Sequence, residues 1–230
     1  DHRGKRMKDI FLLDVDDTLL DFHRAEREQV IATLAEHGIA ADESTADLFH
    51  VINDSLWKKL ERGEITRDKL VVERFEILLE KLGAKGDAKS LSRSFFEGMP
   101  QRAYAMAGAE AFLRTLGSRG RVYAVTNGAK TLQRRRIASA GLAPFFTDIF
   151  ISDEIGFNKP SAGYVNHVLS HIPDFVRDRA VYVGDSLTSD MVCAESMGVD
   201  FILFRAQRPA DYRGMFADTY AAALSLINTL

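Results

Sequence analysis

The stretch Ile10-Phe11-Leu12-Leu13-Asp14-Val15-Asp16-Asp17-Thr18 decides the fold prediction, because an apolar run passes directly into a cluster of carboxylates. The run from Ile10 to Val15 is almost continuously apolar, so we expect a strand that is covered on both faces. In open α/β sheets, ligands bind beyond the carboxyl ends of the strands. The carboxylates at this strand's end are therefore candidate functional groups.

Four further apolar runs predict four more strands, and helical patterns separate them. The predicted strands are Ile10 to Val15, Val122 to Thr126, Ile149 to Ser152, Ala180 to Gly184 and Phe201 to Phe204; the predicted helices are Gly108 to Leu116, Lys130 to Ala140, Ser161 to His171 and Thr188 to Met197. This alternation predicts an α/β fold with a doubly wound, Rossmann-like parallel sheet.

Residues 21–105 interrupt the alternation, because they contain four helical stretches and no strand candidate. The apolar residues Leu48, Ile52, Leu56 and Leu60 form one helical stripe, and Val71, Phe75, Leu78, Leu79 and Leu82 form another. The helix breakers Gly38, Gly63, Gly83 and Pro100 fall between the stripes. We therefore predict an inserted all-helical domain over 21–105 and an α/β core over 7–20 and 106–230. The residues before Met7 are treated as an extension.

Composition favours a globular protein with a small-molecule partner. Hydrophobic residues make up 46% of the chain and charged residues 27%, and the formal net charge is -3. A net negative charge gives no overall attraction to nucleic acid or to an anionic membrane surface. The single cysteine, Cys193, and the lack of a long apolar run in the sequence favour the cytoplasm.

Polar motifs follow the apolar runs. They are Asp14 to Thr18, Thr126-Asn127-Gly128, Asn158-Lys159-Pro160, and Gly184-Asp185-Ser186 followed by Ser189-Asp190. The carboxylates of Asp14, Asp16, Asp185 and Asp190 should converge at one sheet edge, where two unit charges ~4 Å apart repel by about 1 to 4 kcal/mol. The counterions expected there are Mg²⁺ and the ammonium of Lys159. Thr126 and the amides of Asn127 and Gly128 are suited to phosphate oxygens.

The arginine run and the histidines do not predict a functional site. The basic run Arg134 to Arg136 is expected on a solvated helix face. Five of the six histidines, His23, His37, His50, His167 and His171, show no spacing typical of a metal site.

Together, the four motifs resemble in order and spacing the signature motifs of the haloacid dehalogenase (HAD) superfamily. The resemblance implies that Asp14 attacks phosphorus and forms an aspartyl phosphate, while Asp16 protonates the leaving alkoxide and later activates water. It also implies Mg²⁺ ligated by Asp14, Asp16 and Asp185, with Asp190 supporting the metal or Lys159. An acid at Asp16 favours phosphoryl chemistry, because dehalogenases of this superfamily lack one there.

The helical insert resembles the small cap of one branch of the superfamily. The segments Asp14 to Glu26 and Leu56 to Phe75 look like the pyrimidine 5'-nucleotidase branch. This resemblance implies a nucleoside 5'-monophosphate substrate, with Phe22, Arg62 and Arg74 as candidates for contacts to the leaving group. Trp57 and Phe75 are expected in the helical core instead.

Alternative functions remain at this point. A sugar phosphate or phosphoglycolate phosphatase comes next, then a phosphomutase of the β-phosphoglucomutase type. A non-enzymatic phosphoacceptor switch, similar to a response regulator receiver, also clusters carboxylates with a threonine and a lysine. The oligomeric state is expected to be a monomer or a homodimer.

Overall fold

The computed structural model describes residues 7–230; residues 1–6, treated above as an extension, lie outside the described part. The chain divides into two compact units. Among the described residues, the sheet unit comprises residues 7–20 and Ala105–Leu230, and the helical unit comprises Asp21–Tyr104. Among residues 7–230, no helix has both the length and the apolar character needed to cross a membrane.

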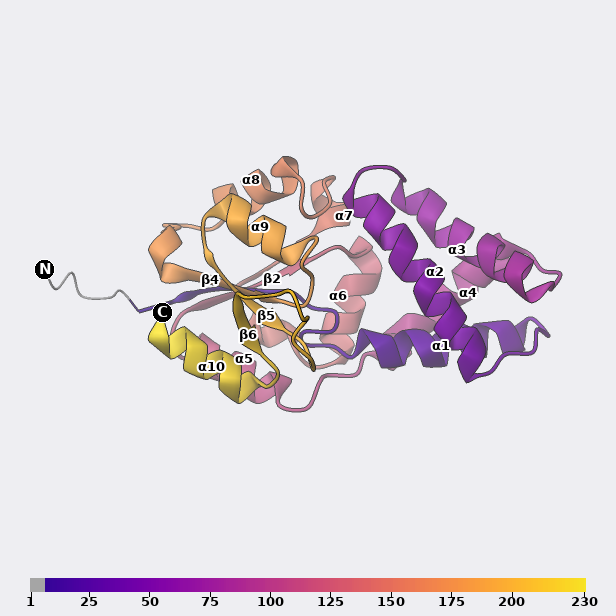
Figure 1. Ribbon diagram of the computed structural model, residues 1–230, viewed down its shortest axis with the longest axis horizontal. Helices are drawn as coiled ribbons and strands as arrows, with labels where there is room; N and C mark the ends of the chain where they lie inside the picture. Colours follow the sequence, from indigo (N-terminus) through magenta and orange to yellow (C-terminus); the bar gives the residue numbers. More distant parts are fainter. Residues whose placement is uncertain (1–6) are drawn as a thin grey trace, which may run out of the picture. The chain divides into compact units, whose positions relative to one another are not determined.

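The sheet unit is built on one parallel sheet with helices packed around it (Figure 1). The strand order is β3-β2-β1-β4-β5-β6. Its strands are β1 (Ile10–Leu13), β2 (Arg121–Thr126), β3 (Asp148–Ile151), β4 (Ala180–Gly184), β5 (Asp200–Phe204) and β6 (Met215–Ala217). Its helices are α5 (Ala109–Gly117), α6 (Lys130–Ser139), α7 (Ser152–Ile155), α8 (Ala162–His171), α9 (Asp190–Met197) and α10 (Tyr220–Thr229). Short 3₁₀ turns cover Ala143–Phe145 and Arg177–Arg179.

Strand β1 shows why the apolar runs predicted a doubly covered sheet. Ile10 and Leu12 pack into a cluster with residues of α8 and α9, while Phe11 and Leu13 pack into a cluster with residues of α5, α6 and α10. Because side chains alternate along a strand, apolar residues at every position supply two cores, one on each face. The predicted doubly wound α/β fold is confirmed.

Three elements of the sheet unit were not predicted: the short helix α7, strand β6 and helix α10. Strand β6 has only three residues, of which Met215 and Phe216 are partly exposed. It lies at the sheet edge, so its sequence lacks the continuous apolar run of a central strand. Helix α10 follows it and buries Ala223 and Ile227 in the cluster of the α5 face.

The helical unit consists of α1 (Phe22–Glu36), α2 (Glu43–Glu61), α3 (Arg67–Leu82) and α4 (Ala88–Gly98), followed by a 3₁₀ turn over Met99–Arg102. Three phenylalanines from different helices form its centre. The ring centroids of Phe49 and Phe75 are 5.1 Å apart, and those of Phe75 and Phe95 are 5.7 Å apart. Phe75 is a core residue, as predicted.

Local signals explain where these helices begin and end. The carboxylate of Asp42 accepts a hydrogen bond from the amide of Thr45, which closes a capping box at the start of α2. After α3, Gly83 adopts a φ of 62°, a left-handed conformation that glycine reaches without steric cost. The glycines at which the sequence predicted helix ends therefore lie at helix ends.

Truncation of Phe75 should destabilise the helical unit. Its ring is buried between Phe49 and Phe95, so Phe75→Ala removes their contacts and leaves a cavity. We expect a loss of about 3 to 5 kcal/mol in the free energy of unfolding, measured by urea titration. Val51→Ala, at a side chain that is 65% exposed on α2, is the matched control and should change it by about 0.5 kcal/mol or less. Equal effects would contradict this account of the core.

Candidate active site

Three of the predicted site residues lie at or just beyond the carboxyl ends of three adjacent strands. Strand β1 lies between β2 and β4, so Asp14, Thr126 and Asp185 come to the same edge of the sheet. The amide of Asp14 donates to the carbonyl of Val183 at 3.0 Å, which continues the β1–β4 pairing into the first polar residue. The sheet thereby fixes the position of the Asp14 backbone.

A buried lysine joins the motifs. Lys159 Nζ donates to Asp14 Oδ1 at 2.9 Å and to Asp190 Oδ1 at 2.7 Å. Its third hydrogen bond goes to the carbonyl of Val125 at 3.0 Å. The ammonium group thus has all three of its donors used within the chain. Lys159, Asp14 and Asp190 are 3%, 6% and 0% exposed.

Asp190 is oriented by its neighbours. Its Oδ1 also accepts from the hydroxyl of Tyr182 at 2.8 Å, and its Oδ2 accepts from the amide of Ser186 at 3.1 Å. A Cβ on Gly184 would lie 2.4 Å from this carboxylate, so only glycine fits there. The structure therefore places Asp190 as the partner of Lys159.

Burial and charge shift the ionisation of the site. Burial, with the charge of Asp190, raises the pKa of Asp14 to about 6. Burial also raises the pKa of Asp185 well above its ordinary value, and the charges of Asp14 and Asp190 add to this effect. Burial alone would lower the pKa of Lys159, but the carboxylates of Asp14 and Asp190 outweigh it and hold the pKa well above its ordinary value. Burial and mutual repulsion thus disfavour the ionised form of these carboxylates, and the single ammonium of Lys159 offsets only part of their negative charge.

A divalent cation fits this arrangement. Oxygen atoms from Asp14, Asp185 and Asp190 all lie within 4.8 Å of one another. Carboxylate oxygens are the ligands that Mg²⁺ prefers. Asp190 accepts two hydrogen bonds at Oδ1 and one at Oδ2, whereas the oxygens of Asp14 accept one each, from Lys159 and Thr18. Asp14, beside Asp185, therefore keeps more capacity for a metal than Asp190 does.

Asp16 differs from the predicted arrangement. Its carboxylate lies outside the group of three that could hold a metal, and Asp190 is in that group instead. Its Oδ1 accepts from Arg136 at 2.7 Å and its Oδ2 from Gln133 at 3.1 Å. The side chain of Asp16 is therefore held by α6.

The prediction of a solvated face for Arg134 to Arg136 was wrong at Arg136. Arg136 is 1% exposed, while Arg134 is exposed and pairs with Glu154. Gln133, Arg136 and Ile137 lie three and four residues apart, so they share one face of α6. Because Ile137 is apolar, its spacing from Gln133 and Arg136 predicts that this face of α6 is buried. The run of three arginines suggested the opposite.

The remaining core motifs are close to Lys159. Asn127 Oδ1 accepts from the amide of Lys159 at 2.7 Å, and Asn127 Nδ2 donates to the Lys159 carbonyl at 3.0 Å. The hydroxyl of Thr126 accepts from Gln133 at 2.8 Å, which leaves its own proton to donate elsewhere. Gly128 is buried, and a Cβ there would lie 3.0 Å from the Gln133 side chain.

The turn after β1 has an uncommon backbone conformation and contacts Asp14. Asp17 has a φ of 58°, which is uncommon for a residue other than glycine, and its amide donates to the Leu20 carbonyl at 2.7 Å. The hydroxyl of Thr18 donates to Asp14 Oδ2 at 3.3 Å. Thr18 therefore contacts the candidate nucleophile directly.

The three candidate substrate contacts lie in the helical unit in different environments. Phe22, the first residue of α1, is half-buried, and Arg62 is exposed and pairs with Glu64. Arg74 is 5% exposed in the core of this unit, and its guanidinium carbon is 4.6 Å from the Phe95 ring centroid. Burial lowers its pKa to about 10. Arg74 was a candidate for contact with the leaving group, and its burial in this core argues against that role. Trp57, expected in the core, is half-buried beside Arg67.

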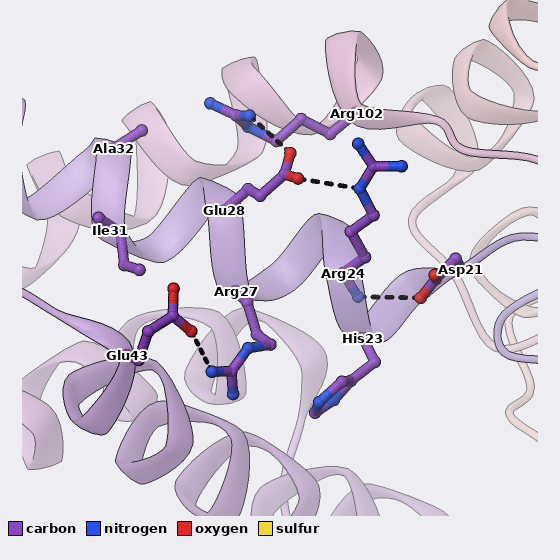
Figure 2. Close-up of a pocket in the computed structure, with 9 residues that line it drawn as sticks. All are labelled: Asp21, His23, Arg24, Arg27, Glu28, Ile31, Ala32, Glu43 and Arg102. Atoms are coloured by element: carbon purple, nitrogen blue, oxygen red, sulfur yellow. Dashed lines mark hydrogen bonds and ion pairs between the residues drawn. The ribbon is translucent and has the colours of Figure 1, made fainter.

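The helical unit also contains a hollow of about 610 Å³ (Figure 2). Its charged residues are Asp21, Arg24, Arg27, Glu28, Glu43 and Arg102, three acidic and three basic. The arginines pair with carboxylates: Arg24 and Arg102 with Glu28, and Arg27 with Glu43. With its charges balanced in this way, the hollow has no excess positive charge for a phosphate group.

Removal of the Lys159 ammonium should destabilise the sheet unit, because Asp14 and Asp190 would lose their buried counterion. In metal-free buffer we expect Lys159→Met to lower the free energy of unfolding by roughly 3 to 5 kcal/mol, measured by urea titration. Lys130→Met, at an exposed position on α6, is the control and should stay within about 0.5 kcal/mol of wild type. Added Mg²⁺ should reduce the loss, since a cation bound by the folded state stabilises it. A Lys159→Met protein as stable as the control would refute the role of this ion pair.

The chain is similar to known proteins over most of its length. The chain is 35% identical over 189 residues to the HAD-hydrolase YfnB of Bacillus subtilis, across 82% of this chain and 80% of that protein. It is 34% identical over 194 residues to the pyrimidine 5'-nucleotidase PynA of Streptococcus pneumoniae, across 84% and 82%. It is 26% identical over 191 residues to the pyrimidine 5'-nucleotidase YjjG of Escherichia coli, across 83% of each.

A solved structure of YfnB from Bacillus subtilis, described as bound to magnesium, matches with a TM-score of 0.89 at 30% identity. It covers 97% of this chain and 100% of that one. The family model for haloacid dehalogenase-like hydrolases matches residues 8–198, which is most of the chain. The chain therefore belongs to the haloacid dehalogenase-like hydrolase family.

Proposed function

We propose that this chain is a Mg²⁺-dependent phosphomonoesterase that acts on nucleoside 5'-monophosphates through a phosphorylated Asp14. The observation that carries the proposal is the buried Asp14–Lys159–Asp190 array at the carboxyl edge of the sheet, with Asp185 beside it and Asp16 held separately by α6. A nucleophile, a fixed cation, metal ligands and a second carboxyl group are the parts that such a reaction needs.

Asp14 is the group best placed for nucleophilic attack. Its backbone is fixed by β4, and Lys159 and Thr18 contact its two oxygens. Attack of an Asp14 oxygen on phosphorus would form the aspartyl phosphate and break the bond to the leaving alkoxide. Lys159 and the Thr126 hydroxyl would then stabilise the negative charge on the transferring group. Mg²⁺ held by Asp14 and Asp185 would add Lewis-acid stabilisation of the same charge.

Asp16 is proposed as the acid and base of the two steps. It would protonate the departing alkoxide and then accept a proton from the water that hydrolyses the aspartyl phosphate. The hydrogen bonds from Gln133 and Arg136 support this role, because they fix the direction of the carboxyl group. We propose Gln133 and Arg136 as positioning residues for Asp16.

The nucleotide preference is supported by two relatives that are named pyrimidine 5'-nucleotidases, PynA and YjjG. The phosphate site serves any phosphomonoester, so discrimination must come from groups that contact the leaving nucleoside. We propose the helical unit as the source of these groups, with Phe22 and the exposed Arg62 as candidates. Sugar phosphates remain the alternative substrates, and the cytoplasmic location stays a prediction.

Asp14→Asn should fold but lose turnover, because an amide cannot replace the attacking carboxylate. We expect phosphate release from a nucleoside monophosphate to fall by at least about 10³-fold. Wild-type activity should need Mg²⁺ and should be lost with a chelator. Asp178→Asn, at an exposed position of the sheet unit, is the matched control and should keep wild-type activity. Full activity of Asp14→Asn would remove Asp14 as the nucleophile, and full activity of metal-free protein would contradict the Mg²⁺ proposal.

The Phe22 side chain offers a test of substrate class. If its ring stacks on the base, Phe22→Ala should cost about 1 to 3 kcal/mol in kcat/KM with a pyrimidine nucleoside monophosphate, as for base stacking in nucleic-acid binding proteins. A small phosphate ester without a base should be much less affected, and it serves as the control substrate. Equal losses on both substrates would mean that Phe22 only supports the loop. A panel in which sugar phosphates outrank all nucleotides would overturn the nucleotidase proposal and leave the phosphatase proposal standing.

A further inference from the structure

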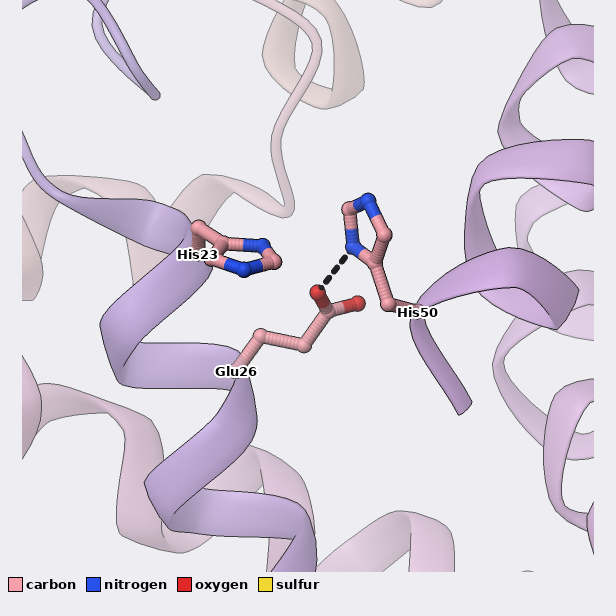
Figure 3. Close-up of side chains that lie close together, drawn as sticks. All are labelled: His23, Glu26 and His50. Atoms are coloured by element: carbon pink, nitrogen blue, oxygen red, sulfur yellow. Dashed lines mark hydrogen bonds and ion pairs between the residues drawn. The ribbon is translucent and has the colours of Figure 1, made fainter. Parts of the chain in front are cut away.

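A second group of ionisable side chains lies within the helical unit. His23 and Glu26 are three residues apart on α1, and His50 comes from the adjacent helix α2 (Figure 3). One possible ligand atom from each residue lies within 4.8 Å of the others. The rings of His23 and His50 meet edge to face, with centroids 4.7 Å apart. We name these three residues the His–Glu triad.

The carboxylate of the His–Glu triad is held by further residues of the same unit. Glu26 is 1% exposed, and its Oε1 accepts from Asn53 Nδ2 at 2.7 Å while its Oε2 bonds with His50 Nδ1 at 2.7 Å. Asn53 Oδ1 accepts in turn from Arg74 at 3.2 Å. Outer hydrogen bonds of this kind orient the ligands of metal sites and raise their affinity.

The histidines, unlike Glu26, are accessible to solvent. The His50 side chain is 42% exposed, and exposed His23 lines the hollow described above (Figure 2). An ion from solvent can therefore approach from the imidazole side toward a carboxylate that is already oriented. The bond between His50 and Glu26 accounts for two members of the triad. The third member, His23, lies beside this bond with its ring against the His50 ring.

We propose that the His–Glu triad binds Zn²⁺, or a similar divalent transition ion, as a site separate from the carboxylates of the sheet unit. Two imidazole nitrogens and one carboxylate oxygen form a ligand set that zinc accepts, with a fourth position left for water. Mg²⁺ prefers oxygen ligands in octahedral geometry and would compete poorly here. On binding, the ion takes the place of the proton that His50 Nδ1 and Glu26 Oε2 share, and this proton passes to solvent.

The proposed site would join α1 and α2, two helices that are otherwise linked by a short loop and by non-covalent packing. Because His23 and Glu26 belong to α1 and His50 to α2, an ion held by all three would fix the first pair of helices in the unit. This function is structural and does not depend on the phosphatase proposal.

The test uses the full chain with saturating Mg²⁺, which occupies the oxygen ligands of the sheet unit, and Co²⁺ as the spectroscopic probe. We expect about one equivalent of Co²⁺ to give the intense visible bands of a four-coordinate ion, and Zn²⁺ to displace it. His23→Ala and His50→Ala, both at accessible positions, should each weaken Zn²⁺ binding by at least about tenfold. His37→Ala is the matched control, because this exposed histidine follows α1 but lies outside the triad.

The same measurements contain the results that would overturn the proposal. Zn²⁺ binding that is unchanged in both His23→Ala and His50→Ala would exclude the triad as the site. A weak six-coordinate Co²⁺ spectrum in wild type would do the same, and would leave His50 and Glu26 as an ion pair. Circular dichroism of each variant establishes that a loss of binding is not a loss of the fold.

Discussion

The ammonium of Lys159 is the group on which the sheet edge depends. Asp14 and Asp190 are almost without solvent, and buried carboxylates without a counterion are unfavourable by several kcal/mol each. Lys159 contacts both, and Asn127 bonds to its backbone amide and carbonyl, so the cation is held from two directions. The charge that stabilises the folded protein is therefore the same charge that can stabilise a transferring phosphate.

The helical unit also pairs a buried carboxylate with a buried cation. There the buried carboxylate is Glu26, and the buried cation is Arg74, which reaches it through Asn53. The two networks differ in their surroundings, since Arg74 lies among phenylalanine rings while Lys159 lies among carboxylates. In both units, hydrogen bonds within a polar network fix the orientation of one carboxylate, that of Asp14 in the sheet unit and that of Glu26 in the helical unit.

Much of this architecture could be predicted from local sequence. The five longer strands were predicted because continuous apolar runs indicate burial on both faces. Three of the four motifs were predicted at strand ends, because parallel strands share one functional edge, and the fourth, Asn158 to Pro160, was predicted in a later loop. Very short elements, and contacts between distant parts of the chain, could not be predicted from local sequence. Strand β6 is too short to show a pattern. The contact of Arg136 with Asp16 joins residues 120 positions apart. The approach of His50 to Glu26 depends on how α1 packs on α2.

The position of β1 has a consequence for how the chain folds. This first strand lies at the middle of the sheet, where Ile10 pairs with Arg121 on one side and with Ala180 on the other. A nascent chain therefore emerges with its most central apolar strand exposed until β2 and β4 have been synthesised. The internal contacts of the helical unit, by contrast, need only residues 21–104 and can form much earlier. Distant pairing slows folding and prolongs the exposure of apolar surface. The period before β4 emerges is thus the interval in which the chain most needs protection from aggregation.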